Sequence, residues 1–289
     1  MKIRTITLLL LAAVSGRGEA QDRSRKAITP PPIKPPLSPV DMSQLPSGTQ
    51  QLDLYLLLGQ SNMKGRGVMP LDPMKNPRII NMHLKTDDWY LARHPLHLTG
   101  SPETFKGHDN AGVGPGLAFA EVLTKKYPKS RIGLVPGAGG GSAMSRWTRE
   151  GPLYKNAIRR AKLALSAGPE GKTRLRGAIW LQGEADSREG RIEVYADALS
   201  KMIEDLRTDL GVKDLPFIAC TIGEMRAPAV MQKRMNRILL DLPQRTNHTG
   251  CVDARDLTTH IGDSVHFDTA AQEQIGQRFA KEFLRIVGE

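Results

Sequence analysis

Five short apolar segments recur along the chain, and they constrain the fold more than any other feature of the sequence. Each has the length of a strand, and most lack the alternation of a half-exposed strand, as expected for strands covered on both faces. The segments are Leu52–Leu58, Ile132–Val135, Ala178–Leu181, Phe217–Ile222 and Cys251–Ala254. Helical patterns lie between them. The sequence therefore predicts a three-layer α/β/α sandwich around a parallel sheet of about five strands with right-handed crossovers.

Three amphipathic helices are expected, two between the strands and one after the last strand. The first is expected at Pro115–Tyr127 and the second at Val194–Leu210. One face of the second helix is apolar and is formed by Leu199, Met202, Ile203, Leu206 and Leu210. The last helix carries Ala271, Ile275, Phe279 and Phe283 at four-residue steps. This spacing indicates helices that cover the two faces of the sheet.

The N-terminal region is organised differently from the rest of the chain. Residues 1–20 combine two early cations, a short apolar run and small residues, which is typical of a secretory signal peptide. A membrane anchor is the weaker interpretation, because a transmembrane helix needs about 20 apolar residues. Residues 21–49 are rich in proline and indicate a semi-rigid linker. The sequence thus predicts a single domain at residues 50–289 of a secreted or periplasmic protein.

Charge and cysteine content exclude several classes of protein. The formal net charge is +11, but the basic residues are scattered and only 5% of residues are aromatic, so nucleic-acid binding is not favoured. The sequence contains two cysteines, which is too few for a disulfide scaffold. Cys220 and Cys251 are either bridged or remain two reduced core thiols. The histidines form no metal-binding pattern, and no phosphate loop is present.

Polar and glycine-rich residues follow several of the predicted strands. GQSNM comes after Leu58, PGAGGGSAMSRW after Val135, and QGEAD after Leu181. Because open α/β sheets bind ligands at the carboxyl ends of their strands, we expect a functional site at this edge.

A serine and a histidine within these segments are candidates for nucleophilic catalysis. Ser61 follows a strand directly, where a strand-to-helix turn would present its hydroxyl, although a helix cap is the alternative role. His266 has Asp263 three residues before it, and a turn of that length can place the carboxylate against one imidazole nitrogen. The alternative for His266 is an ordinary surface loop.

Other side chains in the same segments are candidates for substrate and transition-state contacts. The Gln182 side chain is a candidate oxyanion donor, and Glu184 can either orient a histidine or cap the next helix. Gln60 and Asn62, which flank the serine, are expected to bind substrate. The glycine run containing Gly140 offers backbone amides, or is only a flexible loop. Trp147 is expected to form an apolar or sugar-stacking wall.

Taken together, these segments resemble the S-G-N-H hydrolase superfamily, specifically its carbohydrate esterase family six and sialate O-acetylesterase-like branch. The resemblance covers roughly residues 50–285 and is carried by LGQSNMKGRG, IGLVPGAGGGSAMSRW, WLQGEAD and DSVHFDTAAQEQIGQRFA. It implies Ser61 as nucleophile, His266 as base, and an oxyanion hole of the Ser61 and Gly140 amides with the Gln182 side chain. Either Asp263 or Glu184 would support the histidine.

The activity that the resemblance implies is hydrolysis of acetyl esters on a carbohydrate, of the acetylxylan or sialate type, through an acyl-enzyme. No metal or organic cofactor is expected, and the expected partner is the acetylated carbohydrate itself. Two alternatives remain at this point. One is a short-chain esterase acting on non-carbohydrate esters, and the other is a relative that binds carbohydrate without catalysis.

Overall fold

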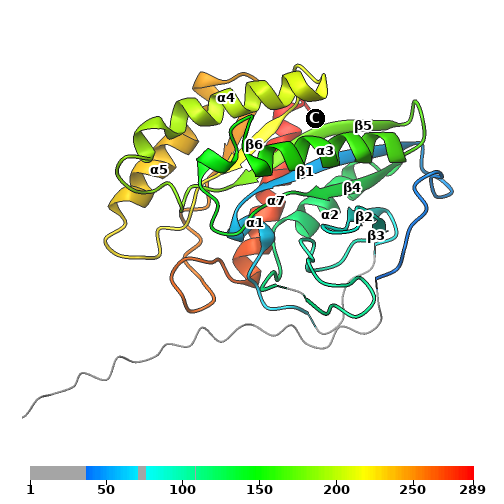
Figure 1. The fold of residues 1–289 in the computed structure, drawn as a ribbon, viewed down its shortest axis with the longest axis horizontal. Helices are drawn as coiled ribbons and strands as arrows, with labels where there is room; N and C mark the ends of the chain where they lie inside the picture. Colours follow the sequence, from blue (N-terminus) through cyan, green and yellow to red (C-terminus); the bar gives the residue numbers. More distant parts are fainter. Residues whose placement is uncertain (1–36, 71–75, 108) are drawn as a thin grey trace, which may run out of the picture.

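A seven-stranded sheet forms the centre of the computed structural model, which describes residues 37–70, 76–107 and 109–289 (Figure 1). The strand order is β3-β2-β4-β1-β5-β6-β7, and all neighbouring pairs are parallel except β2 with β3. The strands are β1 Gln51–Gly59, β2 Ile79–Met82, β3 Trp89–Leu91, β4 Ser130–Pro136, β5 Thr173–Leu181, β6 Phe217–Cys220 and β7 Thr249–Val252. The five predicted strands are thus present, and two more extend one edge.

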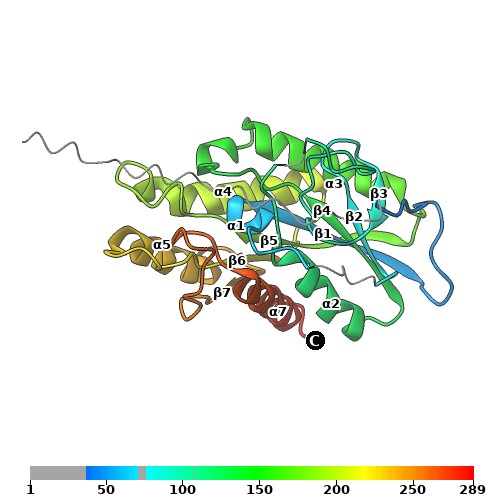
Figure 2. The same cartoon turned by 90° about the horizontal axis from the view of Figure 1, so that it is seen from below.

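Helices cover both faces of the sheet, which confirms the predicted three-layer α/β/α architecture (Figure 2). One face packs against α3, α4 and α5, and the other against α2 and α7. The helices are α1 Ser61–Lys64, α2 Gly116–Lys126, α3 Pro152–Ala167, α4 Ile192–Leu210, α5 Val230–Leu240, α6 Leu242–Arg245 and α7 Thr269–Ile286, with a 3₁₀ turn at Met144–Arg146. Within the described ranges, no helix has both the length and the apolar character needed to cross a bilayer.

The apolar faces predicted from helical spacing are those that the core buries. The four residues predicted for one face of α7 are each at most 1% exposed: Ala271, Ile275, Phe279 and Phe283. Phe283 and Phe119 of α2 contact the ring of Tyr55 edge-on, with centroid distances of 5.3 Å and 5.1 Å. Aromatic contacts of this kind stabilise the junction between β1 and the two helices.

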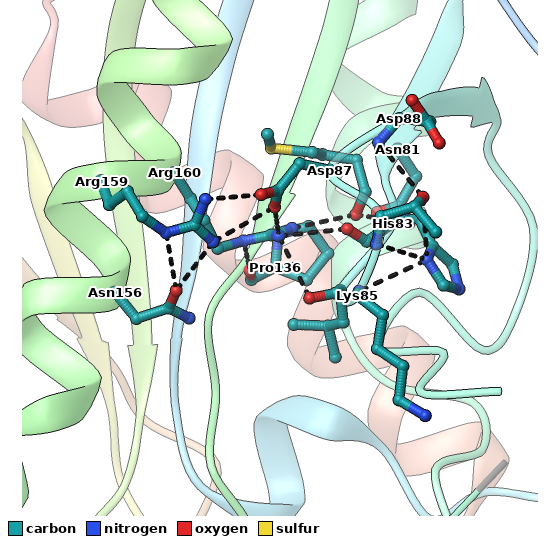
Figure 3. A network of polar contacts seen from close by, with 12 residues as sticks. Asn81, His83, Lys85, Asp87, Asp88, Pro136, Asn156, Arg159 and Arg160 are labelled. Atoms are coloured by element: carbon teal, nitrogen blue, oxygen red, sulfur yellow. Dashed lines mark hydrogen bonds and ion pairs between the residues drawn. The ribbon is translucent and has the colours of Figure 1, made fainter. Parts of the chain in front are cut away.

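The two strands missed by the sequence analysis form a short hairpin at the sheet edge. β2 and β3 are only four and three residues long, too short for a periodicity signal. Their connection is held by Arg160 of α3, whose guanidinium is 0% exposed and pairs with Asp87 (Figure 3). The same guanidinium donates to the backbone carbonyls of Met82, His83 and Pro136 at 3.2, 3.1 and 2.9 Å. This hairpin therefore depends on a distant side chain rather than on local sequence.

Part of the predicted linker contacts the sheet edge. The predicted signal peptide, residues 1–20, and the first part of the linker lie outside the described residues. Within the remaining part of the predicted linker, Val40 N–H donates to the Trp89 carbonyl at 2.8 Å, and Met42 is 8% exposed against the core. Residues 37–45 therefore pack along β3 instead of forming a free tether, because the edge strand offers unpaired backbone groups and an apolar surface.

The two cysteines are free thiols on neighbouring strands. Cys251 of β7 is opposite Ala219 of β6, so Cys220 is displaced by one residue. Because side chains alternate along a strand, the two thiols point to opposite faces of the sheet and do not form a disulfide.

Candidate active site

Three loops meet at the carboxyl edge of the sheet, where the sequence predicted a site. α1 begins at Ser61 immediately after β1, residues 137–143 follow β4, and residues 182–186 follow β5. The Gly139 N–H donates to the Gly59 carbonyl at 3.0 Å, which ties the glycine-rich loop to the turn before the serine. Segments far apart in sequence are thereby brought together around one hydroxyl.

The turn that presents Ser61 requires glycine. Gly59 has φ +133°, and a Cβ at that position would lie 2.2 Å from the carbonyl oxygen of Leu181. Only glycine tolerates both the conformation and the approach of β5. The chain then enters α1 at Ser61, whose side chain is largely buried but not sealed, at 6% exposed.

Ser61, His266 and Asp263 form a continuous hydrogen-bonded chain. His266 Nε2 lies 2.8 Å from Ser61 Oγ, and His266 Nδ1 lies 2.5 Å from Asp263 Oδ2. A carboxylate only accepts, so Nδ1 carries the proton and Nε2 is free to accept the serine proton. This order of carboxylate, imidazole and hydroxyl is the arrangement that makes a serine nucleophilic.

The turn that carries Asp263 also fixes the charge of its carboxyl group. Asp263 Oδ1 accepts hydrogen bonds from the backbone N–H groups of Val265 and His266 at 3.0 and 2.9 Å. Partial burial alone would raise the pKa of Asp263, but the hydrogen bonds from the His266 side chain and from both N–H groups lower it below its ordinary value. The carboxylate therefore stays ionised and can stabilise an imidazolium.

Glu184, the other candidate for the triad acid, has no hydrogen bond to His266. Its Oε1 accepts from Asn62 Nδ2 at 2.5 Å, and its Oε2 is buried without a hydrogen-bond partner in the described part of the chain. Burial raises the pKa of Glu184, while the Asn62 hydrogen bond and the nearby His266 act in the opposite direction. The structure thus places Asp263, and not Glu184, in contact with the histidine.

Two backbone N–H groups near the start of α1 and in the glycine-rich loop are without an acceptor in the described part of the chain. The Ser61 N–H opens α1, the Gly140 N–H belongs to the exposed glycine-rich loop, and neither donates to another residue of the described ranges. Both N–H groups therefore stay candidates for the oxyanion donors that the resemblance implies.

Gln182 does not have the free amide that the sequence analysis assigned to the oxyanion hole. Its side chain is 0% exposed, and Nε2 donates to the Ser142 carbonyl at 3.0 Å and to the Asp186 carboxylate at 2.6 Å. Its Oε1 accepts from the Tyr195 hydroxyl at 2.8 Å. An amide nitrogen has two protons, and both are used inside the protein. Gln182 therefore fixes the position of the glycine-rich loop through its hydrogen bond to the Ser142 carbonyl.

Gln60 and Asn62 also differ from the expectation that they bind substrate. Gln60 is 3% exposed, and its Oε1 accepts from the Ala185 N–H at 3.3 Å. Asn62 is 0% exposed and makes hydrogen bonds only within the protein. Both side chains are therefore buried and connect loops instead of facing solvent.

Trp147 is buried and does not form a sugar-stacking wall. It is 0% exposed and packs edge-on against Trp180, with ring centroids 5.0 Å apart. Its Nε1 donates to Ser142 Oγ at 3.3 Å. The 3₁₀ turn before Trp147 directs the ring inward, so the indole supports the glycine-rich loop from the core side.

Two further polar residues of the site were missed by the sequence analysis. Asp186 accepts from the Met144 N–H at 2.8 Å and from Gln182 Nε2 at 2.6 Å. Gln272 of α7 is 0% exposed and donates to the Asn62 carbonyl at 3.0 Å. A glutamine on the apolar face of a helix is a signal that could have indicated a buried polar contact. Across the described ranges, no cluster of three or more metal-ligating side chains occurs.

Comparison with known proteins gives the family of this chain. The family model for carbohydrate esterase, sialic acid-specific acetylesterase matches residues 51–285. The chain belongs to this family. Its members are carbohydrate acetylesterases, that is, carboxylic ester hydrolases, and the predicted resemblance is confirmed.

Relatives of this chain occur in a plant and in a bacterium. A probable carbohydrate esterase of Arabidopsis thaliana is 30% identical over 277 residues, covering 89% of this chain and 97% of the plant protein. A probable 9-O-acetyl-N-acetylneuraminic acid deacetylase of Escherichia coli K12 is 30% identical over 117 residues, covering 34% and 35% of the two chains.

Solved structures show the same fold. The crystal structure of an Arabidopsis thaliana protein is similar with a TM-score of 0.69 at 29% identity, over 81% of this chain and 98% of that one. The crystal structure of NanS has a TM-score of 0.65 at 20% identity, with coverage of 87% and 99%.

Proposed function

We propose that this esterase hydrolyses acetyl esters on a carbohydrate through a covalent acyl-enzyme on Ser61. The observation that carries the proposal is the chain from Asp263 through His266 to Ser61, with contacts of 2.5 and 2.8 Å. The family supports a carbohydrate ester as the substrate class. No step in this chemistry requires a metal or an organic cofactor.

Acylation begins when Ser61 Oγ attacks the acetyl carbonyl carbon and His266 Nε2 takes the hydroxyl proton. The carbonyl oxygen becomes an oxyanion, which the N–H groups of Ser61 and Gly140 stabilise. Collapse of the tetrahedral intermediate breaks the bond to the sugar oxygen, and that oxygen takes the proton from His266. Asp263 remains ionised and stabilises the imidazolium during both transfers.

Deacylation repeats the sequence with water as nucleophile. His266 takes a proton from water, the hydroxide adds to the acetyl-Ser61 carbonyl, and the same N–H groups stabilise the second oxyanion. Acetic acid leaves as the proton returns to Ser61 Oγ, and it then loses its own proton to water. The products are acetate and the deacetylated sugar, and the enzyme regains its starting protonation state.

We propose that Arg66 lets the enzyme choose between an acidic and a neutral sugar. Its side chain is 8% exposed, and Nη1 donates to the Asn110 carbonyl at 2.6 Å. Nη2 would lie 3.7 Å from a Cβ on Gly140, so the guanidinium borders the glycine-rich loop. A guanidinium edge binds carboxylates in a bidentate manner. We expect kcat/KM to favour acetylated sialic acid over acetylated xylooligosaccharides, and Arg66→Met to remove that preference.

The remaining candidates are a short-chain esterase without carbohydrate preference and a carbohydrate-binding protein without turnover. Acetate release from acetylated sialic acid, acetylated xylan and an aryl acetate separates them. A catalytic carbohydrate esterase releases acetate from at least one of the sugars, and Ser61→Ala loses this activity while keeping the parent melting temperature. Release from the aryl acetate alone would favour the short-chain esterase.

We also propose that the chain is exported, with residues 1–20 acting as a signal peptide. The apolar run after two cations supports this proposal. Mass spectrometry of the protein recovered outside the cytoplasm is expected to show a chain that lacks about the first 20 residues. An intact N-terminus on the exported protein would contradict cleavage.

A further inference from the structure

We propose that Asn62 is a positioning residue that sets His266 against Ser61, and this inference rests on the proposed function. Asn62 follows the nucleophile directly in α1, yet its side chain points away from solvent and is 0% exposed. It therefore shares the backbone of the nucleophile while facing the interior of the site.

The amide of Asn62 holds the backbone on both sides of His266. Its Oδ1 accepts from the Phe267 N–H at 3.1 Å, and its Nδ2 donates to the Val265 carbonyl at 3.1 Å. The residues before and after His266 are thus both hydrogen-bonded to Asn62, which is the neighbour of Ser61 in the chain. Displacement of the His266 loop relative to α1 breaks at least one of them.

Two further side chains hold Asn62 itself in place, and we call the three residues the Asn62 bracket. Glu184 Oε1 accepts from Asn62 Nδ2 at 2.5 Å, and Gln272 Nε2 donates to the Asn62 carbonyl at 3.0 Å. Glu184 comes from the loop after β5 and Gln272 from α7. The bracket therefore joins three parts of the chain behind the catalytic residues, and Glu184 acts through Asn62 rather than on the histidine.

The loop that carries His266 gains from such support because it is only partly buried. The side chains of Asp263 and His266 are 41% and 20% exposed, and Phe267, which is 0% exposed, is the apolar anchor beside them. Hydrogen bonds to Asn62 fix the orientation that one apolar contact leaves free. A misplacement of about 1 Å can cost about 10²-fold in rate, which sets the expected size of the effect.

Asparagine is the residue type that these contacts require. Nδ2 supplies two donors and Oδ1 supplies an acceptor, whereas an aspartate of the same shape supplies only acceptors. Asn62→Asp would therefore lose the bonds to Glu184 and Val265, and would set two carboxylates side by side in a buried place. Adding Glu184→Gln exchanges the two functional groups, so that the new glutamine donates to the new aspartate.

A second asparagine provides a matched control. Asn236 of α5 is 1% exposed, and its Nδ2 donates to Glu224 Oε1 and to the Ile222 carbonyl, both at 2.9 Å. Its Oδ1 accepts from the Ile222 N–H at 2.8 Å. The chemistry matches that of Asn62, but no residue next to His266 is among its partners. Asn236→Asp therefore also sets a buried aspartate beside a glutamate, but it changes no hydrogen bond to the residues next to His266.

The test compares the parent, Asn62→Asp, Asn62→Asp/Glu184→Gln, Asn236→Asp and Ser61→Ala. Turnover of an aryl acetate, the rate of Ser61 labelling by an aryl phosphonate, the pH dependence of kcat/KM and the melting temperature are measured for each. We expect Asn62→Asp to slow turnover and labelling by about 10²-fold. The double variant is expected to recover about tenfold of this loss, because the two sites are coupled. Asn236→Asp is expected to lower the melting temperature while turnover stays within about threefold of the parent.

The NMR signal of the His266 Nδ1 proton gives a readout that does not depend on turnover. It is assigned by its loss in Asp263→Asn, and it is expected to shift or broaden in Asn62→Asp but not in Asn236→Asp. An unchanged signal together with parent-like rates in Asn62→Asp would overturn the inference, as would an equal loss of activity in Asn236→Asp. A parent protein that neither turns over nor labels would instead contradict the proposed function.

Discussion

Two buried polar clusters hold loops of this molecule in place, and they differ in what depends on them. Arg160 is a buried charge that ties the β2–β3 hairpin to α3 and to the end of β4 (Figure 3). Asn62 is a buried neutral amide that ties α1 to the loop around His266. No partner of Arg160 is a triad residue, whereas two partners of Asn62, Val265 and Phe267, flank the catalytic histidine. We therefore expect the Arg160 cluster to stabilise the fold and the Asn62 cluster to position His266.

The two clusters also differ in what the loss of their central side chain is expected to cost. A buried guanidinium is stable only while all its partners remain, so its loss is expected to appear in the free energy of unfolding. Burial lowers the pKa of Arg160 to about 10, although the pairing with Asp87 opposes this, and the group stays charged at neutral pH. A neutral amide carries a smaller desolvation cost, and its loss is expected to appear mainly in rate.

The largest effect is expected at Asp263. Asp263→Asn removes the carboxylate that orients His266 and is expected to lower kcat by up to about 10⁴-fold. The melting temperature should change little, because the side chain is 41% exposed. Steady-state kinetics with an acetylated sugar checks this prediction.

Glu184→Gln is the paired variant for Asp263→Asn. It keeps an oxygen to accept the Asn62 hydrogen bond, so it should lose markedly less activity. The reverse ranking, with Asp263→Asn nearly active and Glu184→Gln inactive, would transfer the acidic role to Glu184.

The next effect is expected in stability at the other cluster. Arg160→Met removes the donor to several buried carbonyl groups and leaves Asp87 with Arg159 as its remaining ion-pair partner. This is expected to lower the free energy of unfolding by about 3–5 kcal/mol. Urea denaturation measures the loss. Turnover per folded molecule should stay close to that of the parent, and a selective loss of kcat without destabilisation would abolish the distinction between the clusters.

A smaller and mixed effect is expected at Gln182. Gln182→Leu removes the side-chain donor to the Ser142 carbonyl and to Asp186 and the side-chain acceptor for the Tyr195 hydroxyl. A buried group left unpaired costs about 1–3 kcal/mol. The kcat of the folded variant should fall by less than the roughly 10²-fold that a lost oxyanion donor costs. A larger fall in kcat at unchanged stability would support the original assignment of Gln182 as an oxyanion donor.

The smallest effect is the pH dependence contributed by Glu184. Its pKa is raised in the folded state, so the protonated form favours folding, and this contribution is lost as pH rises above the ordinary value of 4.5 through the raised pKa. Glu184→Gln has no such loss. The melting temperature of the variant relative to the parent should therefore be higher at pH 7 than at pH 4. An equal difference at both pH values would show that the carboxylate is not desolvated.

Much of the fold was predictable because the buried strands are continuous apolar runs and α7 has a regular apolar face. The triad contacts followed from local sequence for Asp263 and His266, which share one turn. The hairpin of β2 and β3 was not predictable, because Arg160 holds it from α3. The directions of Gln60, Asn62 and Trp147 were not predictable either. A side chain beside a nucleophile faces substrate or core according to how the turn rotates, and sequence does not show this.

Covalent trapping tests the central claim most directly. The parent, Ser61→Ala and His266→Ala are incubated with an aryl phosphonate, and the intact mass and the modified peptide are determined by mass spectrometry. The triad predicts a stoichiometric adduct on Ser61 in the parent, none in Ser61→Ala, and greatly slowed labelling in His266→Ala. Full acetylesterase activity in a folded Ser61→Ala, or an adduct at another residue that accounts for inhibition, would contradict the assignment of Ser61 as nucleophile.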